Sequence, residues 1–162
     1  MNSKDALNYM LVSTQHMVPM FLKDLDDADI QVRPVPGANN IAWQIGHLIA
    51  SETQLGGMLG IKYAELPPVI QALGKASSSQ THGDGGNLAK DHYLKLFNQV
   101  RETTIAGLAK IAEEELDKPA PDGVSAMAPK LGNIIGLIAN HSMMHCGQFT
   151  VVRRLLNKPV LF

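Results

Sequence analysis

The sequence contains a single cysteine, Cys146, so no internal disulfide can form, which is compatible with a reducing compartment. The net charge at pH 7 is only −1, and the sequence has no basic stripe of the kind that binds nucleic acid. No apolar run approaches the roughly 18 residues that a membrane span needs. Residues 1–5 lack the basic-then-apolar layout of a signal peptide. We therefore expect a soluble, cytoplasmic protein without a nucleic-acid or membrane partner.

The overall composition is that of a globular protein. The 162 residues are 45% apolar and 18% charged. A chain of this length is sufficient for one domain with a full hydrophobic core. We therefore predict a single domain over residues 1–162.

Apolar residues recur in four segments at the i, i+3, i+4, i+7 spacing of one helix face, and no strand-like alternation competes with this pattern. The segment between the second and third helices is rich in proline, glycine and serine, and it is long enough to connect two parallel helices. We predict it to be an irregular crossover over residues 60–87. The predicted fold class is all-α, a four-helix bundle. Its helices are predicted at residues 3–26, 41–59, 88–116 and 129–157.

Two histidines of the fourth predicted helix, His141 and His145, are four residues apart, so their imidazoles lie on one face about one turn from each other. They stand where the pattern calls for isoleucine or leucine, so we expect both rings to face the core. A buried ring nitrogen without a partner costs roughly 1–3 kcal/mol, and a metal ion would satisfy such nitrogens. A core histidine is, however, more often hydrogen-bonded to a carbonyl, and the two-histidine motif alone is short and common.

A third ligand would strengthen the case for a metal site. Position favours His47, which lies near the start of the second helix and can reach the level of His141 and His145 if the two helices run antiparallel. However, it lies about 120° from the centre of its helix's apolar stripe. Periodicity therefore leaves this assignment open. The candidates by residue type are His16, His47, Glu52, His92 and Glu102.

Two segments carry a resemblance to a known family. These are ANNIAWQIGHLIASE at residues 38–52 and NHSMMHCGQFTVVRRLLNKP at residues 140–159. In this order they resemble the DinB-like (damage-inducible) family of small bacterial metal proteins. The resemblance implies an up-down-down-up four-helix bundle, a homodimer, and a nickel or zinc ion bound by His47, His141 and His145, with coordination positions open to water. Relatives in that family include bacillithiol transferases and mycothiol-dependent maleylpyruvate isomerases.

Three classes of function remain open from the sequence, the first of which is a metal-dependent enzyme. An ion with an open position can activate water, as in a hydrolase, or a low-molecular-weight thiol, as in a thiol transferase. A non-catalytic metal-binding module and a metal-free helical dimer are the alternatives. Glu52 and Gln148 are candidates for supporting the site. We expect Cys146 to be a packed thiol, because its side chain points about 100° away from that of His145.

Overall fold

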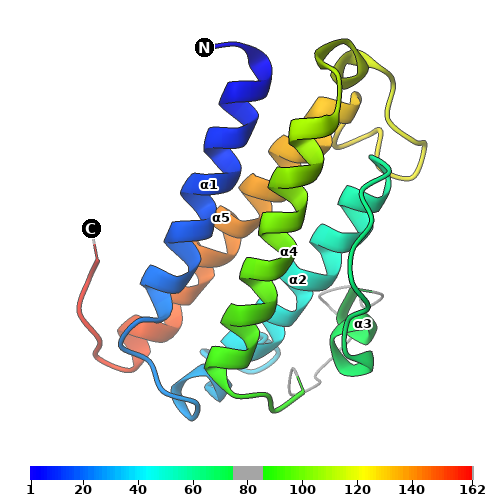
Figure 1. Ribbon diagram of the computed structural model, residues 1–162. Coiled ribbons are helices and arrows are strands. Elements are labelled where there is room, and N and C mark those ends of the chain that lie inside the picture. Colours follow the sequence, from blue (N-terminus) through cyan, green and yellow to red (C-terminus); the bar gives the residue numbers. More distant parts are fainter. Residues whose placement is uncertain (75–85, 162) are drawn as a thin grey trace.

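The computed structural model describes residues 1–74 and 86–161, and four long helices form its bundle (Figure 1). In that part of the chain the β pairing consists of an isolated bridge between Pro119 and Lys130. None of its helices is both long and apolar enough to cross a membrane. The α-helices are α1 (Ser3–Leu22), α2 (Ile41–Gly57), α3 (Pro68–Gly74), α4 (Lys90–Lys110) and α5 (Leu131–Leu155).

The long helices occupy the corners of a square in which α1 and α2 each pack against both α4 and α5. α1 and α4 run in opposite directions, since Lys4 near the start of α1 donates to the carbonyl of Ala109 at the end of α4, 2.7 Å away. α2 and α4 run in the same direction, and α5 runs with α1 (Figure 1). α2 is therefore antiparallel to α5, which was the condition for His47 to reach the two histidines of α5.

The predicted helices are confirmed, but several of their ends differ. α1 stops at Leu22, before the predicted residue 26. The acidic residues that follow form a separate turn, in which the side chains of Asp26 and Asp29 accept from each other's backbone N–H groups at 2.8 and 3.2 Å. The third predicted helix, 88–116, is divided. α4 ends at Lys110, and a 3-10 helix at Glu113–Asp117 then brings Leu116 into the core.

The described part of the predicted irregular crossover contains the short helix α3 (Pro68–Gly74). Proline suits the first turn of a helix because its missing N–H would have no intrahelical partner there. Ile70 and Leu73 of α3 are buried against α2, where Gly46 leaves room for them. A Cβ atom at Gly46 would lie 2.4 Å from Leu73 Cδ1. The close approach of α3 to α2 therefore depends on this glycine. Residues 75–85 of the predicted crossover lie outside the described residues.

A buried guanidinium, that of Arg101 on α4, bonds to the other three long helices. It is fully buried and makes a bidentate ion pair with Glu52 of α2, at 2.8 Å from Nε and 2.9 Å from Nη2. It also donates to the Leu11 carbonyl and the Thr14 hydroxyl of α1 and to the Ser142 hydroxyl of α5. Every N–H-bearing nitrogen of the guanidinium therefore has a partner, which compensates for the loss of its hydration.

Replacing Arg101 with methionine should lower the free energy of unfolding by about 3–5 kcal/mol, because Glu52 would remain buried without its counter-charge. Lys118→Met is the matched control. Lys118 pairs with Glu115 on the surface, where both side chains are largely exposed, and such a pair contributes about 0–1 kcal/mol. Urea unfolding monitored by circular dichroism measures both variants. Equal losses in the two would contradict the assigned role of Arg101.

Candidate metal centre

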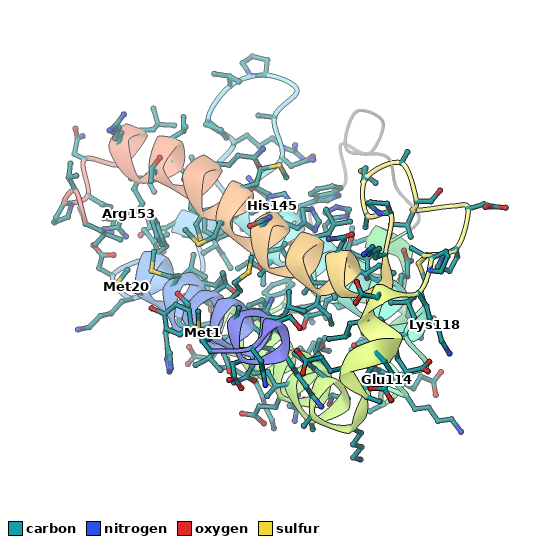
Figure 2. The ribbon with its side chains drawn as sticks, turned by 90° about the horizontal axis from the view of Figure 1, so that it is seen from above. Met1, Met20, Glu114, Lys118, His145 and Arg153 are labelled. Atoms are coloured by element: carbon teal, nitrogen blue, oxygen red, sulfur yellow. The ribbon has the colours of Figure 1, made fainter. Side chains whose placement is uncertain are left out.

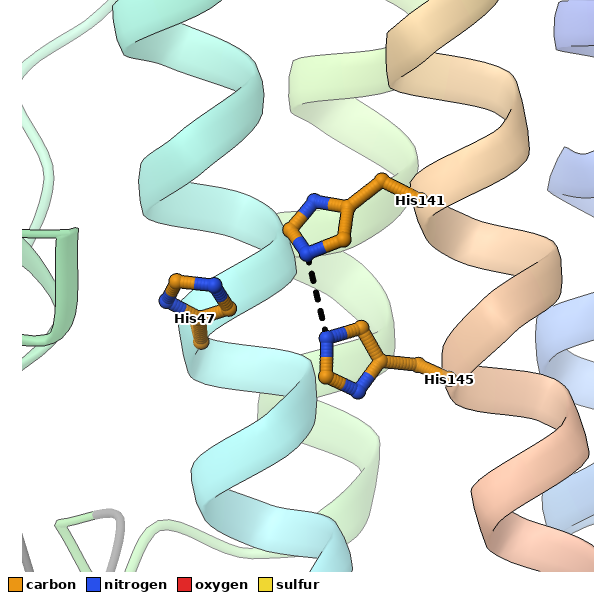
Figure 3. Close-up of side chains that lie close together, drawn as sticks. All are labelled: His47, His141 and His145. Atoms are coloured by element: carbon orange, nitrogen blue, oxygen red, sulfur yellow. Dashed lines mark hydrogen bonds between the residues drawn. The ribbon is translucent and has the colours of Figure 1, made fainter. Parts of the chain in front are cut away.

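The structure brings the three predicted histidines together, with His47 on α2 facing His141 and His145 on α5 (Figure 3). The centroid of the His47 ring lies 5.1 Å from that of His141 and 5.8 Å from that of His145. One nitrogen from each ring lies within 4.8 Å of the other two. His145 is 4% exposed, and the other two rings are half-buried. Figure 2 shows His145 near the middle of α5, well away from Arg153 at the end of that helix.

His47 is held in place by two groups, one stacked on the face of its ring and one hydrogen-bonded to a ring nitrogen. The indole of Trp43, one helical turn earlier, stacks on it with a centroid distance of 4.9 Å and an interplanar angle of 14°. The carbonyl oxygen of Leu73 lies 3.0 Å from Nδ1. A carbonyl can only accept a hydrogen bond, so Nδ1 carries the hydrogen. Nε2 is then the nitrogen with a free lone pair, as a metal ligand requires.

His145 is oriented in the same way by Gln44. The side-chain amide nitrogen of Gln44 donates to the carbonyl of Asn39 at 3.0 Å, which directs its Oε1 towards His145. Nδ1 of His145 lies 2.9 Å from this oxygen and donates to it. The lone pair of His145 is therefore on Nε2, which faces the other histidines. Gln44 lies three residues before His47, so both side chains project from one side of α2.

The spacing of the nitrogens fits a shared ion. Nε2 of His141 and Nε2 of His145 are 3.1 Å apart, as the dashed line in Figure 3 marks. Two imidazole nitrogens bound to one tetrahedral zinc ion at about 2.0–2.1 Å would be about 3.3 Å apart. The same spacing also permits a hydrogen bond, with His141 Nε2 donating to His145. The His47 ring is farther away, since its centroid lies 5.1 and 5.8 Å from those of His141 and His145, which are 4.8 Å from each other.

The cluster is electrically suited to bind a cation, because its rings resist protonation. Burial, together with the neighbouring His141 and His47, lowers the pKa of His145 from 6.5 to about 3, while Gln148 works in the opposite direction. Burial and the proximity of His47 lower the pKa of His141 to about 4. Both imidazoles are therefore neutral at pH 7, and protons compete little for their lone pairs.

All three histidines line a pocket of about 550 Å³ that opens to solvent between α2, α5 and the segment before α2. Its wall contains amide side chains at Asn39, Gln44 and Gln148, and apolar side chains such as Val35 and Val151. In the described part of the chain, no aspartate, glutamate, lysine or arginine lines it. A small molecule can therefore reach the histidines, and it would meet neutral hydrogen-bonding groups there.

The characteristic sequence pattern of the DinB superfamily matches residues 10–149, a range that contains all three histidines. The chain belongs to the DinB superfamily. Its fold is also similar to that of YfiT from Bacillus subtilis, with a TM-score of 0.63 and 18% sequence identity over 96% of this chain and 89% of YfiT. YfiT is named as a probable metal-dependent hydrolase with an unusual four-helix bundle topology. No match to a curated protein sequence was found.

Among the described residues, the other candidate ligands of this DinB-superfamily chain do not join the cluster. His16 and His92 are exposed on α1 and α4, and His82 lies outside the described residues. Glu52 is paired with Arg101 and also accepts from the Thr104 hydroxyl at 2.6 Å. Glu102 is exposed and lines a separate pocket beside Tyr63.

Two further residues that the sequence singled out near the site are Cys146 and Gln148. Cys146 is 1% exposed and belongs to the hydrophobic core, and burial raises the pKa of its thiol to about 12. It is therefore a packed thiol, as expected, rather than a nucleophile. Gln148 lines the pocket into which the three histidines open.

Sequence reasoning missed the groups that orient the rings. Gln44 and Trp43 precede His47 by three and four residues, a spacing that places them on its side of the helix and could have identified them. The Leu73 carbonyl has no such signal, because it is a backbone group of a helix that the sequence did not predict.

The metal-free protein should lose stability as the pH falls from 6.5 towards 4. An unfolded imidazole takes up a proton near pH 6.5, whereas the folded rings take one up only near pH 4 and 3, so acid favours the unfolded state. The stabilisation is fully present above pH 6.5, and we expect a loss of about 3–5 kcal/mol from the two rings together between pH 7 and pH 4.5. Urea unfolding of chelator-treated protein at the two pH values measures it.

The matched variants are His141→Gln with His145→Gln, which removes both titrating rings, and His16→Gln, which removes an exposed one. The first should flatten the pH dependence and the second should leave it unchanged. An unchanged slope in the double variant would show that other groups cause the loss.

Proposed function

We propose that His47, His141 and His145 bind one divalent metal ion, nickel or zinc, and that the protein is a metal-dependent enzyme. The observation that carries this proposal is the convergence of three histidines, two of which have Nδ1 held by Leu73 and Gln44 so that Nε2 faces the centre. A histidine that binds metal through one ring nitrogen usually donates a hydrogen bond from the other, which fixes its tautomer and orientation. When bound, an ion on three neutral ligands would keep its full charge and lower the pKa of a water or thiol at its open positions.

The surroundings favour a catalytic site over a purely structural one. A structural zinc site is closed by four protein ligands. Here, the described residues supply three nitrogens, and the rings line an open pocket of about 550 Å³. Asn39 and Gln148 can hydrogen-bond a molecule in that pocket without adding charge.

The pocket wall favours a thiol over water as the nucleophile, and so a low-molecular-weight-thiol transferase. A thiol with a pKa of about 8.5 needs only a small shift to ionise at pH 7, whereas water starts at about 15.7. Activation of water therefore benefits more from a general base, and no carboxylate lines the described pocket. Hydrolysis is the second candidate, supported by the fold shared with YfiT.

Protein purified without an affinity tag or added metal should contain about one nickel or zinc ion per chain by inductively coupled plasma mass spectrometry. His47→Ala, His141→Ala and His145→Ala should each remove most of it. The controls are His16→Ala, His82→Ala and His92→Ala, which should keep it. If His92→Ala empties the site and His47→Ala does not, the third ligand is wrong. If no substitution changes the metal content, the histidines do not form a metal site.

The choice of nucleophile can be measured with two model reactions of the metal-loaded protein. In the first, bacillithiol or cysteine displaces chloride from 1-chloro-2,4-dinitrobenzene, forming the C–S bond and releasing chloride and a proton. In the second, water cleaves 4-nitrophenyl acetate. We expect at least a tenfold acceleration of the first reaction over the uncatalysed rate, lost in His141→Ala, and little acceleration of the second. Faster ester cleavage with no thiol reaction would favour the hydrolase.

A further inference from the structure

A second pocket, of about 570 Å³, lies beside the histidine cluster, between the later part of α2 and the earlier part of α5. We call it the methionine pocket. Its size is within the range of small-molecule binding sites. Its apolar wall consists of Leu55, Met58, Met127, Leu137 and Met144.

The methionine pocket has a different chemical character from the pocket described above. His141 is the one ionisable side chain among its described lining residues. Met58, Met127 and Met144 are 40%, 71% and 53% exposed, although methionine is usually buried. Clustered exposed apolar side chains mark a binding surface, and the flexible methionine side chain adapts to ligands of different shape. The pocket is therefore suited to an uncharged, apolar group.

The two pockets meet at the histidines. His141 and Met144 line both of them. Ser51, which lines the methionine pocket, has its hydroxyl 3.4 Å from Nε2 of His47. A group bound in the methionine pocket would therefore lie directly beside the nitrogens that converge at the site.

We propose that the methionine pocket binds the apolar part of a small-molecule substrate, an uncharged alkyl or aryl group, and holds its reacting atom at the histidine cluster. The polar pocket, with Asn39 and Gln148, is then left for the thiol or water. This inference rests on the proposed function and adds the substrate class. It predicts a preference for uncharged apolar substrates over charged ones, with tolerance for the shape of the apolar group.

The first test uses acetohydroxamate, hexanohydroxamate and octanohydroxamate as probes of the metal-loaded protein by isothermal titration calorimetry. The hydroxamate group binds metal, and the alkyl chain reports on the neighbouring pocket. Affinity should rise about two- to fourfold per added methylene in the wild type. Met127→Glu and Met58→Glu should abolish this rise without weakening acetohydroxamate. Val151→Glu, a control on the wall of the other pocket only, should keep it.

The second test does not depend on a metal. The uncharged fluorescent probe N-phenyl-1-naphthylamine should bind the metal-free wild type and the Val151→Glu variant, and at least tenfold more weakly to Met127→Glu and Met58→Glu. Absence of metal or of acetohydroxamate binding would overturn the proposed function alone. Binding of acetohydroxamate without a chain-length effect, or equal probe binding in all variants, would overturn the pocket assignment. So would a change from dimer to monomer in Met127→Glu by sedimentation, because a second copy of the chain would then be the occupant.

Discussion

The relative positions of the helices depend on one interaction, the bidentate ion pair between Arg101 and Glu52 in the middle of the bundle. An unpaired charge there would be too costly, so the helices must be placed where every guanidinium nitrogen finds an acceptor. Arg101 donates to both Glu52 of α2 and Ser142 of α5, so this requirement fixes the position of α2 along α5. Ser51 and His141, which directly precede these two residues in sequence, are placed at the same time. The histidine cluster thus lies next to an interaction that fixes the relative positions of α2 and α5.

The bundle therefore contains two adjacent polar regions that meet the cost of burial in different ways. Arg101 keeps its charge and is matched by a carboxylate and three further acceptors. His141 and His145 lose their charge, because burial lowers their pKa values far below 7. Glu52 belongs to the region of Arg101, because its carboxylate forms the ion pair with that guanidinium. Had its carboxylate turned towards the histidines, it would have stabilised their protonated forms and opposed cation binding.

The sequence predicted the features that depend on periodicity, and it failed where tertiary contacts decide. The four helices and the pairing of His141 with His145 follow from local spacing alone. His47 could not be assigned from its own helix, because it lies about 120° from the centre of the apolar stripe. It still faces a neighbouring helix, because α2 is buried on nearly all sides. The division of the third helix involves contacts with residues distant in sequence: Lys4 donates to the terminal carbonyls of α4, and Leu116 of the following 3-10 helix is buried in the core. α3 was missed because two turns with two buried side chains leave almost no periodic signal.

The position of Cys146 restricts where a reactive thiol could come from. It directly follows His145, yet it belongs to the core and does not line the pocket, and burial raises the pKa of its thiol to about 12. It is also the chain's one cysteine. Any thiol chemistry at the histidines must therefore use a sulfur brought by a small molecule. The neutral amides of Asn39 and Gln148 can hydrogen-bond to a polar thiol compound in the pocket. A carboxylate at the same place would repel the ionised form of the thiol.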